Sequence, residues 1–441
     1  MSGPGRSNLQ VNLRGQDLNW YKRSYNPFSY EPYLGATNHI SEIFDINPVS
    51  VGYTWGGEVD FELDKRGDLL GKIELMINRG PIVNGSSSAY INDWEVYSMI
   101  DRVNFKYNNR LFWTVTGDEL YIQLQQRKRL VERESEGYLQ NGVSGTGIGP
   151  NNTGANSISL SSISSQGTVI AGDLQVPWAD RHKHIPMVAM PNKIRVEVFL
   201  KAQQFFINDQ NNPNASNDSV ALNQIWLRCY YVQLPQHLRS EVFTLVNYSE
   251  VTTTGQTAIE QRGVAVKILS TESQLKNIYT GSLNYMNINL RNIKNSVVYF
   301  AVLMRDQNDL ITPWAVNLWN FQPISRMYLV DNGNRITDYY DWFVSSTSNV
   351  NQYNHFTTNA LAFPDGNLWM NVPILPLVEP EFILPSESNC FGSRFIAEYN
   401  NPQLYFETTN APGNTVYQVD IIAYIHNLLI YQNGDIRIWL Q

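Results

Sequence analysis

The sequence predicts an all-β protein, because short segments that alternate apolar and polar residues recur along its whole length. Residues 58–64 change character at every position, and so do residues 72–77, 193–198 and 435–440. Alternation with a period of two buries one face of an antiparallel strand and leaves the other face in water. No long segment with the apolar spacing of a helix interrupts this pattern. We therefore expect antiparallel sheets, with the function carried by loops, pockets or surfaces attached to them.

Length and composition indicate two domains in a chain suited to permanent association. The 441 residues exceed the usual size of one domain. Charged residues account for 16% of the chain, which is low for a globular surface, while aromatic residues reach 12%. Amide and hydroxyl side chains supply much of the remaining polar surface. Such a surface favours lasting contact with other subunits over life as a free monomer.

Strand-like segments fall into two series of similar length. In the first series we predict a short helix at 93–99 and strands at 55–63, 69–78, 102–107, 111–116 and 222–232. Residues 233–240 break the pattern, and we place a domain boundary after residue 235. The second series contains these predicted strands: 241–247, 263–269, 284–291, 297–304, 325–330, 402–407, 416–425 and 435–440. Two sandwiches of about eight strands each, residues 39–235 and 236–441, follow from this rhythm.

Polar segments between the strands predict long exposed loops. Residues 137–172 and 208–219 are rich in Ser, Gly, Asn and Thr, and residues 331–400 are rich in Asn and Pro. The first 38 residues are predicted to form an N-terminal arm without periodicity. Basic and aromatic side chains are interleaved there, including Trp20, Tyr21 and Arg23. Stacking on single-stranded nucleic acid is one interpretation of the arm. We favour an extended arm that packs against a neighbouring subunit.

Net charge and cysteine content narrow the function classes. The formal net charge of −8 argues against general nucleic-acid binding, so we expect no direct contact with a genome. Two cysteines, Cys229 and Cys390, do not make a disulfide framework, and we predict buried free thiols rather than a bridge. The N-terminal segment lacks the apolar core of a signal peptide, and the most apolar segment, 421–431, is too short to span a bilayer. We expect a soluble intracellular chain, at least when it is made.

Histidines and sequence motifs give little support for catalysis. His182 and His184 share one face of a predicted strand and can chelate a metal, but Val188 stands where a third ligand would be needed. Phosphate-binding loops, paired-cysteine motifs and nucleophile elbows are lacking. We therefore expect no enzymatic activity, no metal and no cofactor.

One predicted strand carries a row of carboxylates, which has two interpretations. Residues 58, 60, 62 and 64 are all acidic and lie on one strand face. Paired carboxylates serve as acid and base in glycosidases, and they also bind calcium. We favour a solvated outer face that Lys65, Arg66 and Lys72 partly neutralise. The tripeptide Arg66-Gly67-Asp68, which integrins read, stands where a hairpin turn is required, and Gly-Asp suits such a turn.

Five Asn residues have the spacing of glycosylation acceptors. They are Asn84, Asn151, Asn214, Asn217 and Asn247. A chain rich in Asn and Ser generates such triplets by chance. Without a secretory route, we do not expect the usual glycosylation machinery to use them.

Several weak motifs follow one another along the chain. The segment 59–77 has Lys65-Arg66-Gly67-Asp68-Leu69-Leu70 at its centre, between two predicted strands. A short Trp-containing helix and a strand follow at 93–109 and end in Asn108-Asn109. A Pro/aromatic segment and its successor stand at 174–190, and residues 384–391 precede the last strands. In this order the segments resemble the double-jelly-roll major capsid proteins of large eukaryotic double-stranded DNA viruses, in which Gly-Gly is usual in place of Asn108-Asn109 and Gly is common in place of Glu387.

This resemblance covers residues 39–441 in collinear order and implies a structural role. It implies two eight-stranded jelly rolls side by side, with long loops and a few short helices. It further implies a homotrimeric, pseudo-hexagonal capsomer that tiles an icosahedral virion shell and is assembled in the host cytoplasm or a viral factory. Implied partners are neighbouring capsomers, penton and minor capsid proteins, and, indirectly, an internal viral membrane. Loops such as 137–172 and 331–360 would lie in an outer tower or at subunit contacts.

Candidate inter-subunit contacts are residues of the arm and aromatic residues of the loops. Besides Trp20, Tyr21 and Arg23, they are Trp314, Trp319, Trp342 and Trp369. The alternative is a two-sandwich protein that binds or cleaves carbohydrate, because Trp and Tyr side chains also stack on sugars. The lack of a signal peptide and the collinear motifs favour the capsid interpretation.

Overall fold

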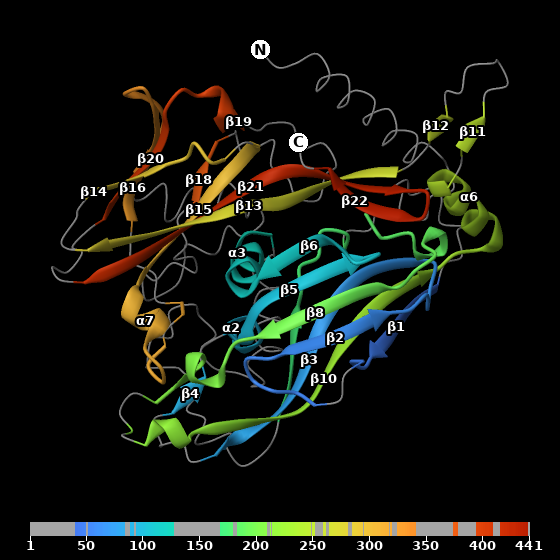
Figure 1. Ribbon diagram of the computed structural model, residues 1–441, viewed down its shortest axis with the longest axis horizontal. Helices are drawn as coiled ribbons and strands as arrows, with labels where there is room; N and C mark the ends of the chain where they lie inside the picture. Colours follow the sequence, from blue (N-terminus) through green and yellow to red (C-terminus); the bar gives the residue numbers. More distant parts are fainter. Residues whose placement is uncertain are drawn as a thin grey trace, which may run out of the picture.

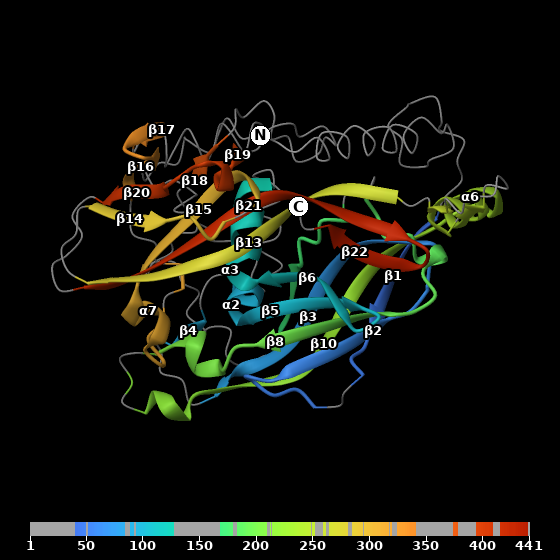
Figure 2. The same cartoon turned by 45° about the horizontal axis from the view of Figure 1, so that its top comes forward.

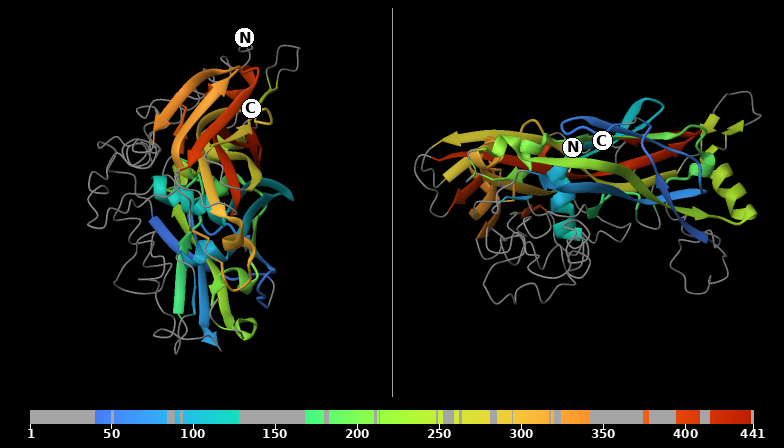
Figure 3. Two further views of the ribbon diagram at one scale, coloured as in Figure 1. Left: turned by 90° about the vertical axis from the view of Figure 1, so that its left-hand side faces the viewer. Right: turned by 90° about the horizontal axis from the view of Figure 1, so that it is seen from below.

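The protein is built from antiparallel sheets with a few short helices (Figure 1). The computed structural model describes residues 40–49, 52–83, 89–91, 94–127, 168–179, 183–209, 212, 214–247, 249–251, 259–261, 264–280, 285–293, 295–316, 318–319, 324–340, 374–377, 394–408 and 415–439. Two sandwiches lie alongside each other, the second above the first in Figures 1 and 2. Figure 3 shows the same arrangement from the end and from below. No helix within these residues is long and apolar enough to cross a membrane.

The first sandwich consists of two four-stranded sheets, as predicted for an eight-stranded jelly roll. One sheet has the order β1-β10-β3-β7: Ile40–Ile46, Ser219–Gln233, Leu69–Val83 and Thr168–Asp173. The facing sheet has the order β2-β8-β5-β6: Glu58–Leu63, Ile194–Leu200, Ile100–Tyr107 and Arg110–Thr116. Short elements complete this half: β4 (Tyr90–Ile91), β9 (Ile207–Asn208), η2 (Met187–Ala189), η3 (Gln203–Phe205) and η4 (Ala215–Asn217).

The second sandwich pairs a six-stranded sheet with a four-stranded one. The larger sheet contains β13 (Val264–Thr280), β21 (Val416–Gln432), β15 (Ser296–Asp306), β18 (Ile374–Pro376), β19 (Arg394–Phe395) and β22 (Asp435–Trp439). This sheet has more than four strands because β18 and β19 both pair with β15, and β22 forms a hairpin with β21. The smaller sheet is β14-β20-β16-β17: Tyr285–Asn289, Pro402–Thr408, Ile324–Asp331 and Asn334–Tyr340. Outside the sandwich lie β11 (Ser249–Val251), β12 (Ile259–Gln261), α7 (Gln307–Ile311) and η7 (Ile396–Glu398).

Asn-containing pairs close three of the hairpins. Asn108 and Asn109 both have positive φ, 49° and 61°, at the turn between β5 and β6. Asn332-Gly333 and Asn433-Gly434 also have positive φ at both positions. This conformation gives the two-residue turns that match strand twist, and Asn and Gly adopt it most readily. The tight turn expected at 108–109 is therefore confirmed.

The β13–β21–β15 sheet is covered on both faces. Tyr299, Ala301 and Leu303 of β15 belong to a hydrophobic core that includes the first sandwich. The intervening Phe300, Val302 and other β15 residues belong to a separate core inside the second sandwich. The apolar segment 421–431 therefore reflects a strand with no solvated face over much of its length. One continuous core thus joins the two halves.

Three helices pack against this framework: α2 (Glu95–Met99), α3 (Gly117–Arg127) and α6 (Gln236–Asn247). Helix α2 confirms the helix predicted at 93–99. The strand predicted at 241–247 is wrong, because these residues continue α6. Leu238, Val242 and Val246 are buried at intervals of four, the spacing of a helix face. Within 241–247, pairs of apolar residues alternate with single polar residues. This pattern was interpreted as a strand, and the four-residue spacing of the helix was overlooked.

Two predicted loops are shorter than expected. Residues 168–172 belong to β7, which pairs with β3 at the edge of the first sandwich. Residues 334–340 form β17 and pair with β16. Strand β1, at the opposite edge of the β7 sheet, was not predicted from the sequence. These edge strands carry mixed composition because they have fewer neighbours to pack against.

Candidate functional site: the junction between the two sandwiches

Helices α2 and α3 lie between the first sandwich and the β13–β21–β15 sheet (Figures 1 and 2). The N-terminus of α3 is held by a capping box. The Thr116 backbone N–H donates to Glu119 Oε2 at 2.8 Å, and the Glu119 N–H donates to Thr116 Oγ1 at 3.3 Å. A Cβ on Gly117 would lie 2.2 Å from the Tyr97 carbonyl oxygen, so α3 approaches α2 too closely for any other residue there. The sequence signal, Thr116-x-x-Glu119, was present but not used in the prediction.

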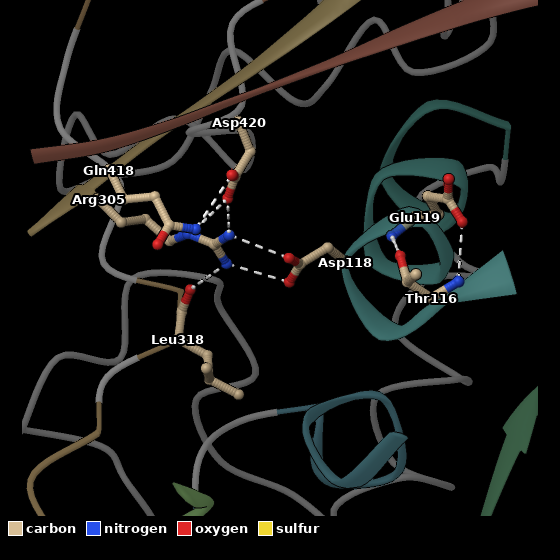
Figure 4. A network of polar contacts seen from close by, with 7 residues as sticks. All are labelled: Thr116, Asp118, Glu119, Arg305, Leu318, Gln418 and Asp420. Atoms are coloured by element: carbon tan, nitrogen blue, oxygen red, sulfur yellow. Dashed lines mark hydrogen bonds and ion pairs between the residues drawn. The ribbon is translucent and has the colours of Figure 1, made fainter. Parts of the chain in front are cut away.

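Arg305 connects α3 to the second sandwich through an ion triad in which Arg305 and Asp420 are buried and Asp118 is partly exposed (Figure 4). Its guanidinium donates to both Asp118 oxygens at 3.0 Å and to Asp420 Oδ2 at 2.7 Å. The Leu318 carbonyl accepts a further bond at 3.4 Å, and Gln418 donates to both Asp420 oxygens. Burial alone would lower the pKa of Arg305, but the two carboxylates outweigh it and raise the pKa. Arg305 is therefore charged, and its side chain is only 2% exposed.

Aromatic stacking adds a second contact beside the triad. The rings of Tyr121 on α3 and Trp319 are stacked, with centroids 4.3 Å apart and planes 22° apart. Glu119 also reaches across the junction, because its side chain bonds to Thr271 of β13. Burial raises the pKa of Glu119 above the ordinary value, although the Thr116 and Thr271 hydrogen bonds oppose the shift. The same short helix thus contributes polar and aromatic contacts to the second half.

The chain segment between the sandwiches is held by Asp68. Leu234 N–H donates to Asp68 Oδ2 at 2.7 Å, and Arg239 Nε lies 2.8 Å from Oδ1. A Cβ on Gly67 would lie 2.7 Å from Tyr231 Cβ. The Arg66-Gly67-Asp68 segment therefore forms a turn between β2 and β3. Because the Asp68 carboxylate is buried against the start of α6, it is not presented to a receptor.

The tip of the β21–β22 hairpin is bound to the first half and to α6. Tyr107 OH donates to the Gly434 carbonyl at 2.8 Å, and the Asn433 N–H donates to the Val246 carbonyl at 2.9 Å. A Cβ on Gly434 would lie 2.7 Å from Pro191 Cδ. The turn at Asn433-Gly434 therefore closes the hairpin and also packs closely against the first sandwich.

At the opposite end, residues 312–316 of the second half form a strap on the first half. The Trp314 N–H donates to the Gln204 carbonyl at 2.9 Å, and the Trp314 carbonyl accepts from the Asp209 N–H at 2.8 Å. Asn208 Nδ2 donates to the Val316 carbonyl at 3.2 Å. Trp314 has a φ of 62°, an uncommon conformation for an aromatic residue. Contacts at both ends and in the middle make the two sandwiches one block.

The predicted contact residues lie in different environments. Trp314 is partly buried in the strap, and Trp319 is 5% exposed inside the junction, so its ring packs within the chain. Trp20, Tyr21, Arg23, Trp342 and Trp369 lie outside the described residues. Exposed apolar side chains among the described residues include Ile40 and Ile43 on the edge strand β1, which are 62% and 56% exposed, and Phe243 on α6, which is 50% exposed. Because strand β1 was not predicted from the sequence, this exposed edge was not predicted either.

The carboxylate row on β2 is a solvated face with cross-strand partners. Lys193 bonds to Glu62 and Asp64 at 2.8 and 3.0 Å, and Arg195 bonds to Asp60 at 2.7 Å. The neutralising cations therefore lie on or next to β8 rather than at Lys65, Arg66 and Lys72, because antiparallel pairing aligns β2 with β8. Glu58, Asp60 and Glu197 have oxygens close enough to hold a metal. Lys106 and Arg195 already pair with Glu197, so this cluster is largely neutralised.

Of the remaining His and Cys candidates, His184 and Cys229 are among the described residues. The His184 ring packs over Gly71, and His182 lies outside the described residues. Cys229 is a fully buried free thiol whose pKa is raised by burial, and Cys390 lies outside the described residues.

Of the predicted glycosylation acceptors, Asn214 and Asn217 are exposed beside η4. Asn247 is half-buried and donates to the Ala189 carbonyl at 3.3 Å. Asn84 and Asn151 lie outside the described residues. Use of any of these sites stays a prediction.

Comparison with solved structures identifies the architecture. VP54 of the virus PBCV-1 superposes with a TM-score of 0.64 at 11% identity, covering 92% of this chain and 97% of that one. The Faustovirus major capsid protein gives 0.64 at 9% identity, covering 91% and 92%. A protein in the structure of the Sputnik virophage gives 0.52 at 9% identity, covering 93% and 92%. No protein-family model matches the sequence, and no curated protein matches it. At these identities the likeness establishes the fold: the double jelly roll found in viral major capsid proteins.

Proposed function

We propose that the protein is a major capsid protein whose homotrimers form pseudo-hexagonal capsomers in an icosahedral virion shell. The observation that carries the proposal is the joining of two jelly rolls into one block by the Arg305 triad, the strap and the β21–β22 hairpin. Three such blocks around one axis present six sandwiches, which is the requirement for a unit with near-hexagonal outline. The double-jelly-roll capsid proteins of similar structure support this role.

Rigidity within the protomer matters because shell contacts are shared among many copies. Each contact between capsomers can be weak, since a closed shell repeats it many times. If the two sandwiches moved relative to each other, each contact between capsomers would have to fix their relative position, and the entropy cost would weaken that contact. The two-sided burial of the β13–β21–β15 sheet opposes such a hinge.

Candidate surfaces for association are the N-terminal arm, the edge strand β1 and the aromatic loops. Strand β1 presents Ile40 and Ile43 to solvent at the edge of its sheet, where an added strand or arm can pair. Trp20, Tyr21, Arg23, Trp342 and Trp369 remain proposed contacts on the same grounds of composition. Proposed partners are neighbouring capsomers, penton and minor capsid proteins and, indirectly, an internal membrane. The proposed location is the virion.

The solution mass tests the trimer directly. The chain is 50.5 kDa, so light scattering should give about 150 kDa for a closed trimer. Trp342→Ala, Trp369→Ala and deletion of residues 1–30 should each shift the equilibrium toward monomer, by about 30-fold for a central contact residue. Trp319→Phe is the matched control, because that ring packs inside the protomer and should leave the mass unchanged. A monomer at all concentrations would contradict the proposal.

Carbohydrate binding is the second candidate function. One of the Trp residues that could stack on a sugar is not accessible to it. Trp319 is stacked on Tyr121 within the junction and does not offer a face to a sugar. Glycan binding that depends on Trp342, in a monomeric protein, would favour this alternative.

A further inference from the structure

Strand β1 is an edge strand that lacks the usual features that discourage pairing with another chain. Within the part of the chain that the structure describes, β1 is paired on one side alone, with β10, and it lies at the right-hand side of the first sandwich in Figures 1 and 2. Its seven residues include neither Lys nor Pro, and they pair with β10 without a register shift. Exposed edge strands usually carry Lys, Pro or a bulge, because their outward N–H and C=O groups otherwise accept another strand.

The outer face of β1 has an apolar residue at its centre. Ile43 is the middle residue of the strand, is 56% exposed and lies beside the half-buried Tyr230 of β10. Asp45 on the same face pairs with Arg228 of β10 at 2.9 Å. Phe44, on the opposite face, packs partly against the core of the first sandwich. The strand is therefore anchored to its own sheet, while Ile43 remains available for a further contact.

Two antiparallel copies of β1 have a self-complementary register about Ile43. Because Ile43 is the central residue, a two-fold axis there aligns the two strands along their whole length. The register then pairs residues of one copy with residues of the other as follows: Ile43 with Ile43, Ser41 with Asp45, Glu42 with Phe44, and Ile40 with Ile46. No acidic residue stands directly opposite another acidic residue, an arrangement that would be destabilising.

Arg66 in the turn between β2 and β3 supplies a charge partner for Glu42 of the second copy. The Arg66 guanidinium carbon lies 5.4 Å from the centroid of the Phe44 ring, and the residue is exposed. Gln233 Nε2 joins these segments, since it donates to the Arg66 carbonyl at 2.7 Å and to Glu42 Oε2 at 3.2 Å. The register places Glu42 of the second copy opposite Phe44, so its carboxylate approaches Arg66. Two-fold symmetry forms this ion pair twice.

The edge strand of the facing sheet, β2, does not offer such a register. Its outward residues are Glu58, Asp60 and Glu62, so antiparallel copies of β2 would place carboxylates opposite one another. Asp60 and Glu62 also have partners already, Arg195 and Lys193 beside them in the same sheet. Of these two edges, β1 is therefore the one suited to a second copy.

We propose that β1 pairs with β1 of a second copy, antiparallel about Ile43, and so joins the β1-β10-β3-β7 sheets of two protomers. Main-chain hydrogen bonds between the two edges hold the strands together, and the Ile43 pair excludes water from the outer face. The Glu42–Arg66 ion pairs fix the register. A two-fold contact lies outside the three-fold contacts of a capsomer, so the inference does not rest on the proposed trimer.

Single cysteine substitutions in the full-length protein test the register. With oxidised glutathione, Ile43→Cys should give a covalent dimer at twice the 50.5 kDa chain mass on a non-reducing denaturing gel. Opposed Cα atoms lie about 4.5–5.5 Å apart, which a disulfide can span. Ser41→Cys and Asp45→Cys should each give no dimer alone, since the two copies of each residue lie about 14 Å apart along the strands. A mixture of these two variants should give the dimer. The wild-type protein controls for the native cysteines.

Charge reversal tests the ion pair. In the Ile43→Cys background, Arg66→Glu and Glu42→Arg should each slow dimer formation by at least about 3-fold, because each opposes like charges across the two-fold axis. The two reversals combined should restore the rate. Lys65→Glu is the matched control: it reverses the exposed neighbouring charge of the same turn and should slow the reaction less.

Three results would overturn the proposal. They are no dimer from Ile43→Cys, a dimer from Asp45→Cys alone as fast as from Ile43→Cys, or a dimer from Ile43→Cys that requires deletion of residues 1–30. The last result would assign the edge to the N-terminal arm. A stable trimer without cross-linked dimers would refute this contact and leave the proposed capsomer intact, whereas cross-linked dimers without a trimer would support the contact alone.

Discussion

Strands β2 and β15 show how differently one chain builds the outer and the central layer of the same block. In β2, buried and more exposed residues alternate from Glu58 to Leu63. In β15, every residue from Val297 to Arg305 is buried. The reason is position: β2 has water on one face, whereas β15 has the first sandwich on one face and the second core on the other. A continuous apolar segment in this protein therefore marks the central layer.

The charged residues follow the same division. On the outer sheet, Arg195 pairs with Asp60 while both side chains remain accessible to water. In the central layer, Arg305 and Asp420 are almost completely buried and make several hydrogen bonds each. A desolvated pair must be complete, because removing one member leaves the other charge buried without compensation. An exposed pair carries no such penalty.

Removal of the central cation should have the largest effect. Arg305→Met should lower the free energy of unfolding by about 3–5 kcal/mol, because Asp420 stays buried with Gln418 as its remaining donor. Arg195→Met is the outer-sheet control and should cost at most about 1 kcal/mol. Urea titrations followed by tryptophan fluorescence measure both. Equal costs for the two substitutions would show that the triad is not a desolvated unit.

Alanine substitutions along each strand should reproduce the difference in layering. Phe300→Ala, Val302→Ala and Leu303→Ala face different cores, yet each should cost about 2–4 kcal/mol. On β2, Phe61→Ala should cost a similar amount, whereas Glu62→Ala should change stability by less than about 0.5 kcal/mol. Urea midpoints for each series provide the measurement. An alternating profile on β15 would mean that one face of the central sheet is solvated.

The smallest expected effect is a pH dependence at the capping box of α3. Burial raises the folded-state pKa of Glu119, so its protonation contributes stability that is present below the ordinary Glu pKa and lost as pH rises through the raised value. Glu119→Gln keeps an acceptor for the Thr116 N–H and cannot ionise. The variant should therefore lose less stability than wild type as pH rises through this window.

Urea midpoints across pH measure this difference. Glu62→Gln on the exposed face of β2 is the matched control and should follow the wild-type curve. Parallel curves for Glu119→Gln and wild type would contradict the assignment.

Local signals predicted much of the fold. Alternation located strands such as 58–63 and 69–78, and Asn108-Asn109 marked a turn whose positive φ angles suit Asn. The helix α6 was missed because its apolar residues recur every fourth position within a segment too short for the helical period to dominate. The edge strand β1 was missed because a strand with one neighbour needs little apolar patterning.

The junction was less accessible to prediction because its partners are far apart in the chain. Arg305 and Asp118 are separated by 187 positions, and nothing local to either residue indicates the pairing. Trp319 shows the converse problem: an aromatic residue in a loop suggests an outer contact, yet docking of the second sandwich buries it against Tyr121. Its environment depends on how two separately patterned halves meet.

By itself the sequence determined the all-β class, the approximate positions of most strands and the chemistry of the tight turns, because each depends on residues within a few positions of one another. Only the tertiary structure decided which faces of β15 and β21 are buried and which charges complete the triad. Those outcomes depend on the burial of surfaces contributed by distant segments, and the resulting desolvation turns an ordinary Arg or Asp into a residue that requires a partner.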